Sequence, residues 1–185
     1  MHANSINKLQ NGGFLKMDQN AAIQHFLDLE RISQLKAGYC RFLDTKQWDR
    51  FRTLFAPDAR FDGFGSAPSG SDVAAFVQGV ANRHKDSITV HQCHMPEIVF
   101  TGPDKARAIW AMMDYCEWPA GYSPKEAPEA RGFYGYGHYE EEYSRIDGEW
   151  KISFLRLTRL RIDPIPDDNA LPRPVRVPAS KDWLP

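Results

Sequence analysis

The hydrophobic positions of this chain follow a helical period in the first half and an alternating period in the second. Over 20–43 apolar residues recur three and four positions apart, which predicts two helices or one bent helix. A second helical stretch is expected over 47–56, where Pro57 ends it. A third helix is expected to follow a cap at Ser71 or Asp72.

In the second half, polar and apolar residues alternate in long β-branched and aromatic runs, which is typical of half-buried strands. We expect strands at about 87–93, 95–101, 106–118, 131–146 and 149–162. Asp147-Gly148 forms a two-residue hairpin turn between the last two strands, and this turn sets their register. The register pairs Tyr143 with Ile152, Glu141 with Phe154 and Tyr139 with Arg156. Helices followed by antiparallel strands predict an α+β fold, with the helices packed on one side of a strongly bent sheet.

A length of 185 residues fits one domain, which we place at residues 20–162. Residues 1–19 show little periodicity and form an N-terminal extension, in which Met17 is an alternative to Met1 as the native start. Residues 163–185 contain six prolines and are expected to form an irregular C-terminal tail. This tail is either disordered or ordered over its own cavity or a neighbouring subunit.

The composition excludes several classes of protein. Hydrophobic residues make up 42% of the chain, and 23 basic residues nearly balance 24 acidic ones, so neither disorder nor nucleic-acid binding is favoured. No window resembles a membrane span or a secretory signal, which predicts a cytoplasmic protein with no membrane partner. The three cysteines form no CxxC pair, so we expect reduced thiols and neither a disulfide framework nor a zinc site.

Asp114 is unusual because it lies among aromatic residues on a strand that is apolar on both faces. A carboxylate in such surroundings must be neutralised, paired or hydrogen-bonded. Arg156 is the expected partner, since it shares a face of the last strand with apolar residues. Alternatively, Arg156 forms an ion pair with Glu141 within the sheet, or points into a cavity and binds an anionic or carbonyl group of a ligand.

Four other polar residues have structural explanations on sequence grounds. His91 and His94 are three residues apart on an extended chain, so they point to opposite faces and make a poor metal site. Asp44 can cap the next helix, with Gln47 reaching back as in a capping box. Tyr39 lies on the apolar stripe and is either a core residue or a donor that needs a partner.

Several short motifs, in this order and spacing, resemble one known family. They are Leu29-Glu30-Arg31-Ile32, Tyr39, Asp44-Thr45-Lys46-Gln47-Trp48-Asp49, Leu54-Phe55-Ala56-Pro57-Asp58-Ala59, Thr89-Val90-His91, Gly148-Glu149-Trp150-Lys151-Ile152 and Arg156-Leu157. They resemble the SnoaL-like proteins of the nuclear transport factor 2-like superfamily over about residues 20–162. The resemblance implies a cone of curved antiparallel sheet closed by helices. Its catalytic members include bile acid 7α-dehydratase, scytalone dehydratase and hexachlorocyclohexane dehydrochlorinase.

The resemblance also implies a site. In those cofactor-free lyases an Asp at the end of the long helix and a His at the start of a strand match Asp44 and His91. Tyr39, Asp114 and Arg156 match further pocket positions, with bile acid 7α-dehydratase as the nearer chemical analogue. Family members of this kind form homo-oligomers, either trimers or dimers.

These observations lead to two hypotheses. The first is a cofactor-independent and metal-free dehydratase-type lyase, or a related isomerase or cyclase, in which Asp44 orients His91 as the base. Its substrate is a hydrophobic, polycyclic or aromatic small molecule, and the side chains expected to bind it, unless they are core residues, are Trp110, Met112, Trp118, Phe133 and Tyr136. The second is a small-molecule-binding or structural subunit without catalysis.

Overall fold

A computed structural model describes residues 18–166, 179–180 and 183–184 of the chain. The elements are α1 (Gln19–Asp44), α2 (Trp48–Arg52), β1 (Phe55–Asp62), α3 (Val73–His84), β2 (Ile88–Gly102), β3 (Lys105–Glu117), β4 (Gly132–Ile146) and β5 (Glu149–Ile165). The predicted α+β class is confirmed. None of the described helices combines the length and the apolar composition needed to cross a bilayer.

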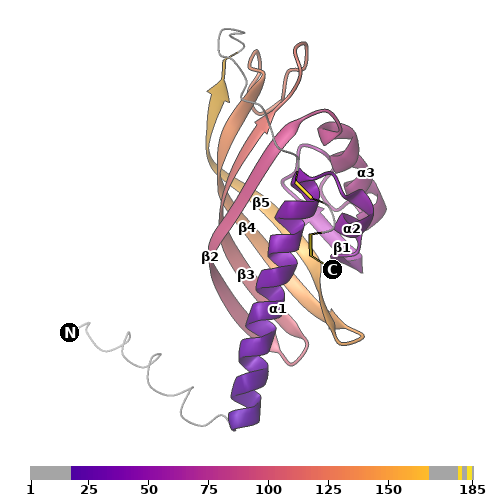
Figure 1. The fold of residues 1–185 in the computed structure, drawn as a ribbon, viewed down its shortest axis with the longest axis vertical. Helices are drawn as coiled ribbons and strands as arrows, with labels where there is room; N and C mark the ends of the chain where they lie inside the picture. The colour runs from indigo at the N-terminus through magenta and orange to yellow at the C-terminus, as the bar shows by residue number, and fades with distance from the viewer. Residues whose placement is uncertain (1–17, 167–178, 181–182, 185) are drawn as a thin grey trace, which may run out of the picture. The chain divides into compact units, whose positions relative to one another are not determined.

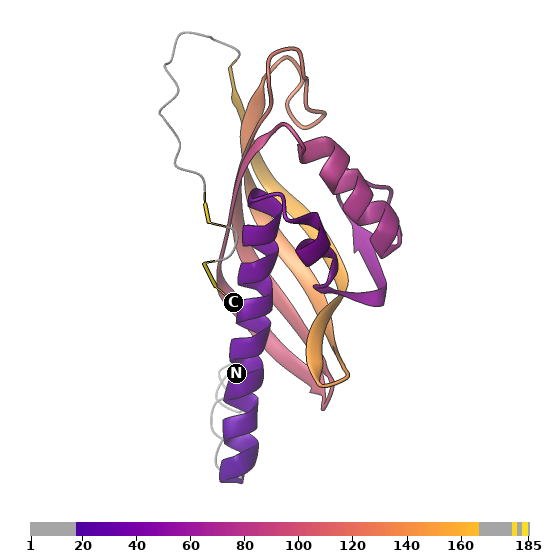
Figure 2. The ribbon, with the colours of Figure 1, turned by 45° about the vertical axis from the view of Figure 1, so that its right-hand side comes forward.

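The five strands form one sheet in the order β1-β5-β4-β3-β2. Strand β1 runs parallel to β5, and the other neighbours are antiparallel. The sheet is strongly twisted, and α2 and α3 lie on the same side of it (Figures 1 and 2). It is not closed into a barrel, because β1 and β2 are its two edges.

The first part of α1, up to Gln34, forms a unit of its own, and residues from Leu35 onward form the second unit. Within the first unit, Asp28 accepts hydrogen bonds from Gln24 at 3.0 Å and from Arg31 at 3.3 Å. Such pairs, three and four residues apart, stabilise a helix surface. α1 is a single helix up to its last residue, which is one of the two alternatives that the sequence left open.

The helix predicted over 47–56 is wrong in its second half. α2 ends at Arg52, and Phe55 already begins strand β1, where it pairs with Ile152. The Phe55 ring contacts the Phe51 ring at 5.1 Å between centroids. Burial of these rings against the sheet outweighs the helical spacing. Pro57 is tolerated within β1 because that strand is an edge of the sheet.

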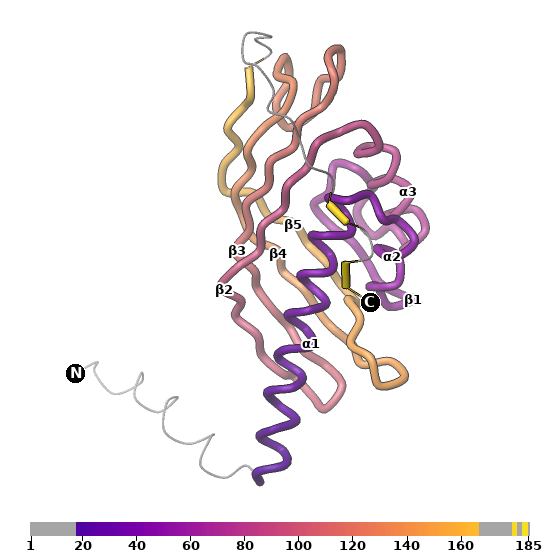
Figure 3. Tube along the Cα trace, viewed as in Figure 1, coloured from indigo at the N-terminus to yellow at the C-terminus, as the bar shows by residue number. Residues whose placement is uncertain are grey.

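The two strands expected on either side of residue 94 are one strand, β2, interrupted by an irregularity in its pairing between His94 and Glu97. Met95 has a φ of 47°, a left-handed conformation that is uncommon outside glycine. This is the geometry of a β-bulge, and Figure 3 shows the bend along β2.

The β4–β5 hairpin turns at Asp147-Gly148 as predicted, and the pair Tyr143–Ile152 is confirmed. A bulge between Glu142 and Tyr143 then shifts the register, so that Glu141 faces Leu155 and Tyr139 faces Leu157. The predicted pairs Glu141–Phe154 and Tyr139–Arg156 are therefore wrong. A shift of one residue turns every later side chain to the other face of the sheet.

β5 ends at Ile165, three residues beyond the predicted strand. Pro164 pairs with Phe133 of β4, at a position that β1 does not reach. A proline is tolerated at this position because β5 has no second neighbouring strand there. Residues 1–17 of the expected extension, and 167–178, 181–182 and 185 of the expected tail, lie outside the described residues.

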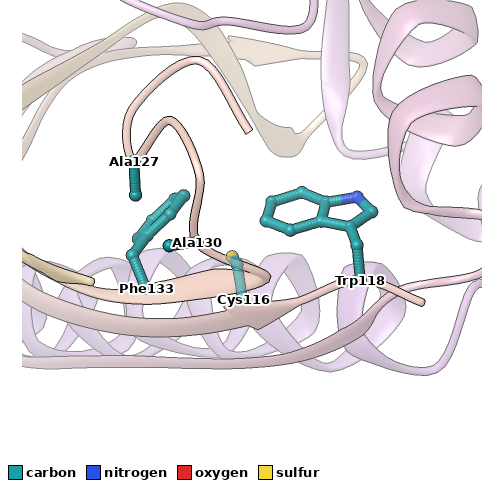
Figure 4. Packing of buried hydrophobic residues seen from close by; sticks show 5 residues of the cluster. All are labelled: Cys116, Trp118, Ala127, Ala130 and Phe133. Atoms are coloured by element: carbon teal, nitrogen blue, oxygen red, sulfur yellow. The ribbon is translucent and has the colours of Figure 1, made fainter. Parts of the chain in front are cut away.

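Aromatic rings fill the space where α2, β1 and α3 meet. Phe61 of β1 stacks on Phe76 of α3 at 3.7 Å between ring centroids, and both side chains are fully buried. A second cluster lies where β3 and β4 adjoin the loop between them, and Figure 4 shows its members, Cys116, Trp118, Ala127, Ala130 and Phe133.

The hairpin turn provides a test of the register. Gly148 has a φ of 82°, and a Cβ there would meet no atom within 4 Å, so a side chain would cost only backbone strain. We expect Gly148→Ala to lower the free energy of unfolding in urea by about 1 kcal/mol. Gly102→Ala is the matched control, because its added Cβ also has space and its φ lies outside the left-handed region. An equal loss in both variants would contradict the assigned turn.

Candidate active site

The carboxylate of Asp44 holds His91 by two hydrogen bonds. Asp44 Oδ2 accepts the His91 backbone N–H at 2.7 Å, and Asp44 Oδ1 lies 2.7 Å from His91 Nδ1. Because a carboxylate only accepts hydrogen bonds, Nδ1 carries the proton and Nε2 of the neutral ring is left with its lone pair. The His91 side chain is 6% exposed and lines a cavity.

The end of α1 places Asp44 for this contact. Lys46 has a φ of 59°, and the Lys46 and Gln47 N–H groups donate to the Leu43 and Phe42 carbonyls. This is a Schellman motif, which satisfies the last carbonyls without a side chain. The alternative that Asp44 caps the next helix is wrong, because Gln47 is the N-cap residue of α2 and no side-chain hydrogen bond caps that helix.

Asp114 of β3 lies directly opposite His91 of β2 and is 2% exposed. Its partner is Arg159 of β5, which donates from Nη1 to Oδ1 and from Nη2 to Oδ2, each at 2.6 Å. Burial alone lowers the pKa of Arg159, but the hydrogen bonds and charge of Asp114 more than compensate and raise it. The expectation that Asp114 needs a paired arginine is met by Arg159 rather than by Arg156.

Gly135 provides the space for this ion pair. It lies opposite Asp114 on β4, and a Cβ at this position would collide with Arg159 Nη1 and Asp114 Oδ1. The pair therefore requires a glycine on the neighbouring strand.

Arg156 lies outside the cavity because of the bulge in the hairpin. It is exposed and forms ion pairs with Asp62 at 3.0 Å and Glu140 at 3.2 Å. The alternative intra-sheet pair with Glu141 is also wrong, since Glu141 pairs with Lys36. Three residues further along β5, Arg159 has the inward orientation expected of Arg156.

Tyr39 lies at the cavity, supported from behind by a buried charge pair. The Lys36 ammonium contacts Glu141 and lies 4.2 Å from the Tyr39 ring centroid and 3.6 Å from the Tyr139 ring centroid. Burial and the charge of Glu141 raise the pKa of Tyr39, and the Tyr139 hydroxyl hydrogen-bonds to it. Tyr39 therefore remains a protonated donor across the physiological pH range. Tyr143 and Trp110 extend the network from Glu141.

α3 contributes cavity residues that the sequence analysis did not identify. His84 lies on the apolar stripe of α3 and lines the cavity, and its Nδ1 is 3.0 Å from Ser87 Oγ. Burial, followed by the positive charge of Lys46, lowers its pKa to about 2. Arg83 pairs with Glu126 of the β3–β4 loop at 2.6 Å. The sequence did contain a signal for His84, because it lies eleven residues after Val73 and therefore on the same apolar stripe of the helix.

The cavity has a volume of about 40 Å³. Among the five side chains expected to bind substrate, Phe133 lines it, whereas Trp110 and Met112 are buried beside it. Trp118 packs on His84 at 5.5 Å between ring centroids, and Tyr136 is not among the lining residues. Trp110, Met112 and Trp118 are therefore buried in the core, and substrate binding by the five residues stays a prediction.

One group of donor atoms has the spacing of a metal site. Atoms of His91, Asp114 and Cys116 all lie within 4.8 Å of one another. Arg159 already occupies both carboxylate oxygens of Asp114, and burial raises the pKa of the Cys116 thiol. A guanidinium and an un-ionised thiol are unsuited to a divalent cation.

The two arginines of β5 give the first test of this geometry. Arg159→Met leaves the buried Asp114 carboxylate without a partner, and we expect a loss of about 3–5 kcal/mol in the free energy of unfolding. Arg156→Met, the matched control, removes only exposed ion pairs and should cost much less. Urea unfolding at pH 7 measures both. An equal loss in the free energy of unfolding for the two variants would contradict the need of the buried Asp114 carboxylate for Arg159.

His84 gives a pH test. Below pH 6.5 His84 binds a proton in the unfolded chain, whereas in the folded chain it stays neutral down to about pH 2. Because the unfolded chain then binds more protons, the free energy of unfolding falls as the pH is lowered. Between pH 7.5 and pH 5 we expect His84→Gln to lose about 2 kcal/mol less than the wild type. His94→Gln, at an exposed position of β2, should lose as much as the wild type. Parallel pH profiles for His84→Gln and the wild type would contradict a buried neutral His84.

Several known proteins are similar to this chain. Probable cyclase FGR4 from Gibberella zeae is 32% identical over 139 residues, which cover 70% of this chain and 89% of that protein. A scytalone dehydratase-like protein from Novosphingobium aromaticivorans has a TM-score of 0.65 at 15% identity, covering 81% of this chain and 99% of its own. The dehydrochlorinase LinA-type3 from Novosphingobium barchaimii has a TM-score of 0.64 at 19% identity, covering 82% and 99%.

The two solved structures share the fold with this chain, and all three relatives bear the names of enzymes. The SnoaL-like domain family matches residues 24–156, which is most of the described chain. Together with the sequence identity to the Gibberella protein, this match identifies the chain as a member of the SnoaL-like family, within the nuclear transport factor 2-like superfamily.

Proposed function

We propose that the protein is a cofactor-independent lyase that removes a proton next to a carbonyl group of a hydroxylated small molecule and returns that proton to the departing hydroxyl, which leaves as water. The observation that carries this proposal is the pair of hydrogen bonds from His91 to Asp44, which leaves Nε2 as a base at a cavity. An imidazole is suited to this role because its ordinary pKa lies near neutral pH.

Asp44 both orients the base and stabilises its product. When His91 Nε2 takes a proton, the ring becomes an imidazolium, and the Asp44 carboxylate lies 2.7 Å from its other nitrogen. The ion pair then forms without movement of either side chain. Preorganised charge of this kind lowers the barrier to proton transfer.

Removal of a proton next to a carbonyl group develops negative charge on the carbonyl oxygen. Tyr39 and Arg159 are the donors proposed to stabilise that charge, since both line the same cavity as His91. Asp114 holds the Arg159 guanidinium by two hydrogen bonds and so fixes the direction of its remaining N–H groups. Asp114 therefore acts as a positioning residue for Arg159, and its carboxylate is engaged in that ion pair rather than free to act as an acid.

The substrate is proposed to be a hydrophobic, aromatic or polycyclic compound with a hydroxyl and a carbonyl group. Pockets for such ligands usually measure about 300–1,000 Å³, whereas the present cavity of about 40 Å³ holds only a few water molecules. Binding therefore requires an opening movement. The Arg83–Glu126 pair joins α3 to the β3–β4 loop and lines the cavity, so it is the contact that we propose to separate.

Two other functions start from the same residues. The name of the Gibberella relative favours cyclisation, in which the carbanion attacks within the same molecule and no water is lost. A binding or structural subunit would use the cavity without proton transfer. The proton-transfer step distinguishes the enzymatic functions from the binding function.

The test is deuterium exchange in a panel of hydroxylated aromatic and polycyclic ketones, incubated with the protein in D₂O and followed by mass spectrometry. Wild type is expected to exchange the proton next to the carbonyl group of its substrate, and loss of water identifies the lyase. His91→Gln should slow exchange about 10²–10⁴-fold, the usual contribution of a general base. His94→Gln is the matched control on the same strand and should exchange at the wild-type rate.

A change of chromatographic retention without loss of water would identify the cyclase instead. If ketones bind to the wild type but neither exchange nor lose water, the proposal fails, and the binding function replaces it.

A further inference from the structure

Cys40 and Cys93 place their sulfur atoms in direct contact. Cys40 Sγ lies 3.4 Å from Cys93 Sγ, although the two residues are 53 positions apart in the sequence. Both thiols are free. A disulfide bond measures about 2.05 Å, so the sulfurs need to approach by about 1.4 Å to form one.

The two cysteines lie between elements that also carry the Asp44–His91 contact. On α1, Lys36, Cys40 and Asp44 are spaced four residues apart and share one face. On β2, Cys93 follows His91 by two residues and points to the same side of the sheet. The thiol contact therefore lies one helical turn from the Asp44 carboxylate and runs between the same helix and strand.

We propose that Cys40 and Cys93 form a reversible disulfide that cross-links α1 to β2 under oxidising conditions. The oxidant is a low-molecular-weight disulfide such as glutathione disulfide. The Cys93 thiolate attacks one sulfur of the oxidant, which forms a mixed disulfide and releases one thiolate. The Cys40 thiolate then attacks the Cys93 sulfur and releases the second. The two cysteines lose two electrons and two protons, and the oxidant becomes two thiols.

The surroundings favour Cys93 as the first to react. Cys93 is partly exposed, whereas Cys40 is buried. The hydrogen bond from the Cys40 thiol lowers the pKa of Cys93 against the effect of burial, and the charge of Lys36 acts in the same direction. A thiol that is both accessible and more easily ionised meets the oxidant first.

The chain is well suited to a direct test by peptide mapping. Trypsin places Cys40 in peptide 37–41, Cys93 in peptide 86–105 and Cys116 in peptide 108–125, so each cysteine is separated from the others. The folded, full-length protein is incubated with glutathione disulfide, the remaining thiols are alkylated after denaturation, and the digest is analysed by mass spectrometry. We expect peptides 37–41 and 86–105 to be joined, with Cys116 alkylated and the bond reversed by dithiothreitol.

Thermal unfolding supplies a second readout that needs no substrate. A cross-link that closes a loop of this length is expected to raise the Tm of the oxidised protein by about 5–10 °C over the reduced protein. Cys93→Ala should lose both the cross-link and the rise in Tm, whereas the matched control Cys116→Ala should keep both. Cys116 is buried opposite Thr89 and Phe133 and lies outside the pair.

Three results would overturn the proposal. One is full alkylation of all three cysteines after oxidation. Another is glutathione retained on Cys93 without a bond to Cys40, which would make Cys93 only an exposed thiol. The third is a cross-link that includes Cys116.

Discussion

Each charge enclosed between α1 and the sheet persists only because an opposite charge or a strong donor is within hydrogen-bonding distance. Lys36 meets Glu141, Asp114 meets Arg159, and Asp44 meets two N–H groups of His91. An unpaired buried charge would cost several kcal/mol, which is a large part of the stability of a domain of this size. The need for pairing therefore fixes the last turn of α1 on β2 and fixes β5 relative to β3.

The three carboxylates differ in the kind of partner that they have, and this difference has a chemical consequence. Lys36 and Arg159 neutralise Glu141 and Asp114, whereas Asp44 faces the imidazole ring of His91. Asp44 also lies at the C-terminal end of α1, where the helix dipole disfavours a negative charge. A proton on His91 Nε2 would complete the neutralisation. The Asp44 carboxylate is thus already in place to stabilise the imidazolium that forms if His91 accepts a proton.

Much of the fold followed from the sequence because its signals are local. The helical stripe of α1, the Asp72 cap of α3 and the Asp147-Gly148 turn each depend on a few neighbouring residues. The start of β1 was missed because tertiary burial of Phe55 overrides a helical spacing. The assignment of Arg156 to the cavity failed for a different reason. A bulge inside a long hairpin leaves no residue signature, yet it turns every later side chain to the other face.

The site itself shows the same division between local and long-range information. The apolar neighbours of Asp114 alone indicate that its carboxylate needs a partner such as an arginine. They do not show that this arginine is Arg159 rather than Arg156. The geometry of Asp44 could not be derived either, because the same carboxylate could equally cap the following helix. Its partner His91 is 47 positions further along the chain, so only the folded chain shows that the two meet. A carboxylate at the wrong end of a helix dipole is a local conflict, and local conflicts that a fold retains are where function is expected.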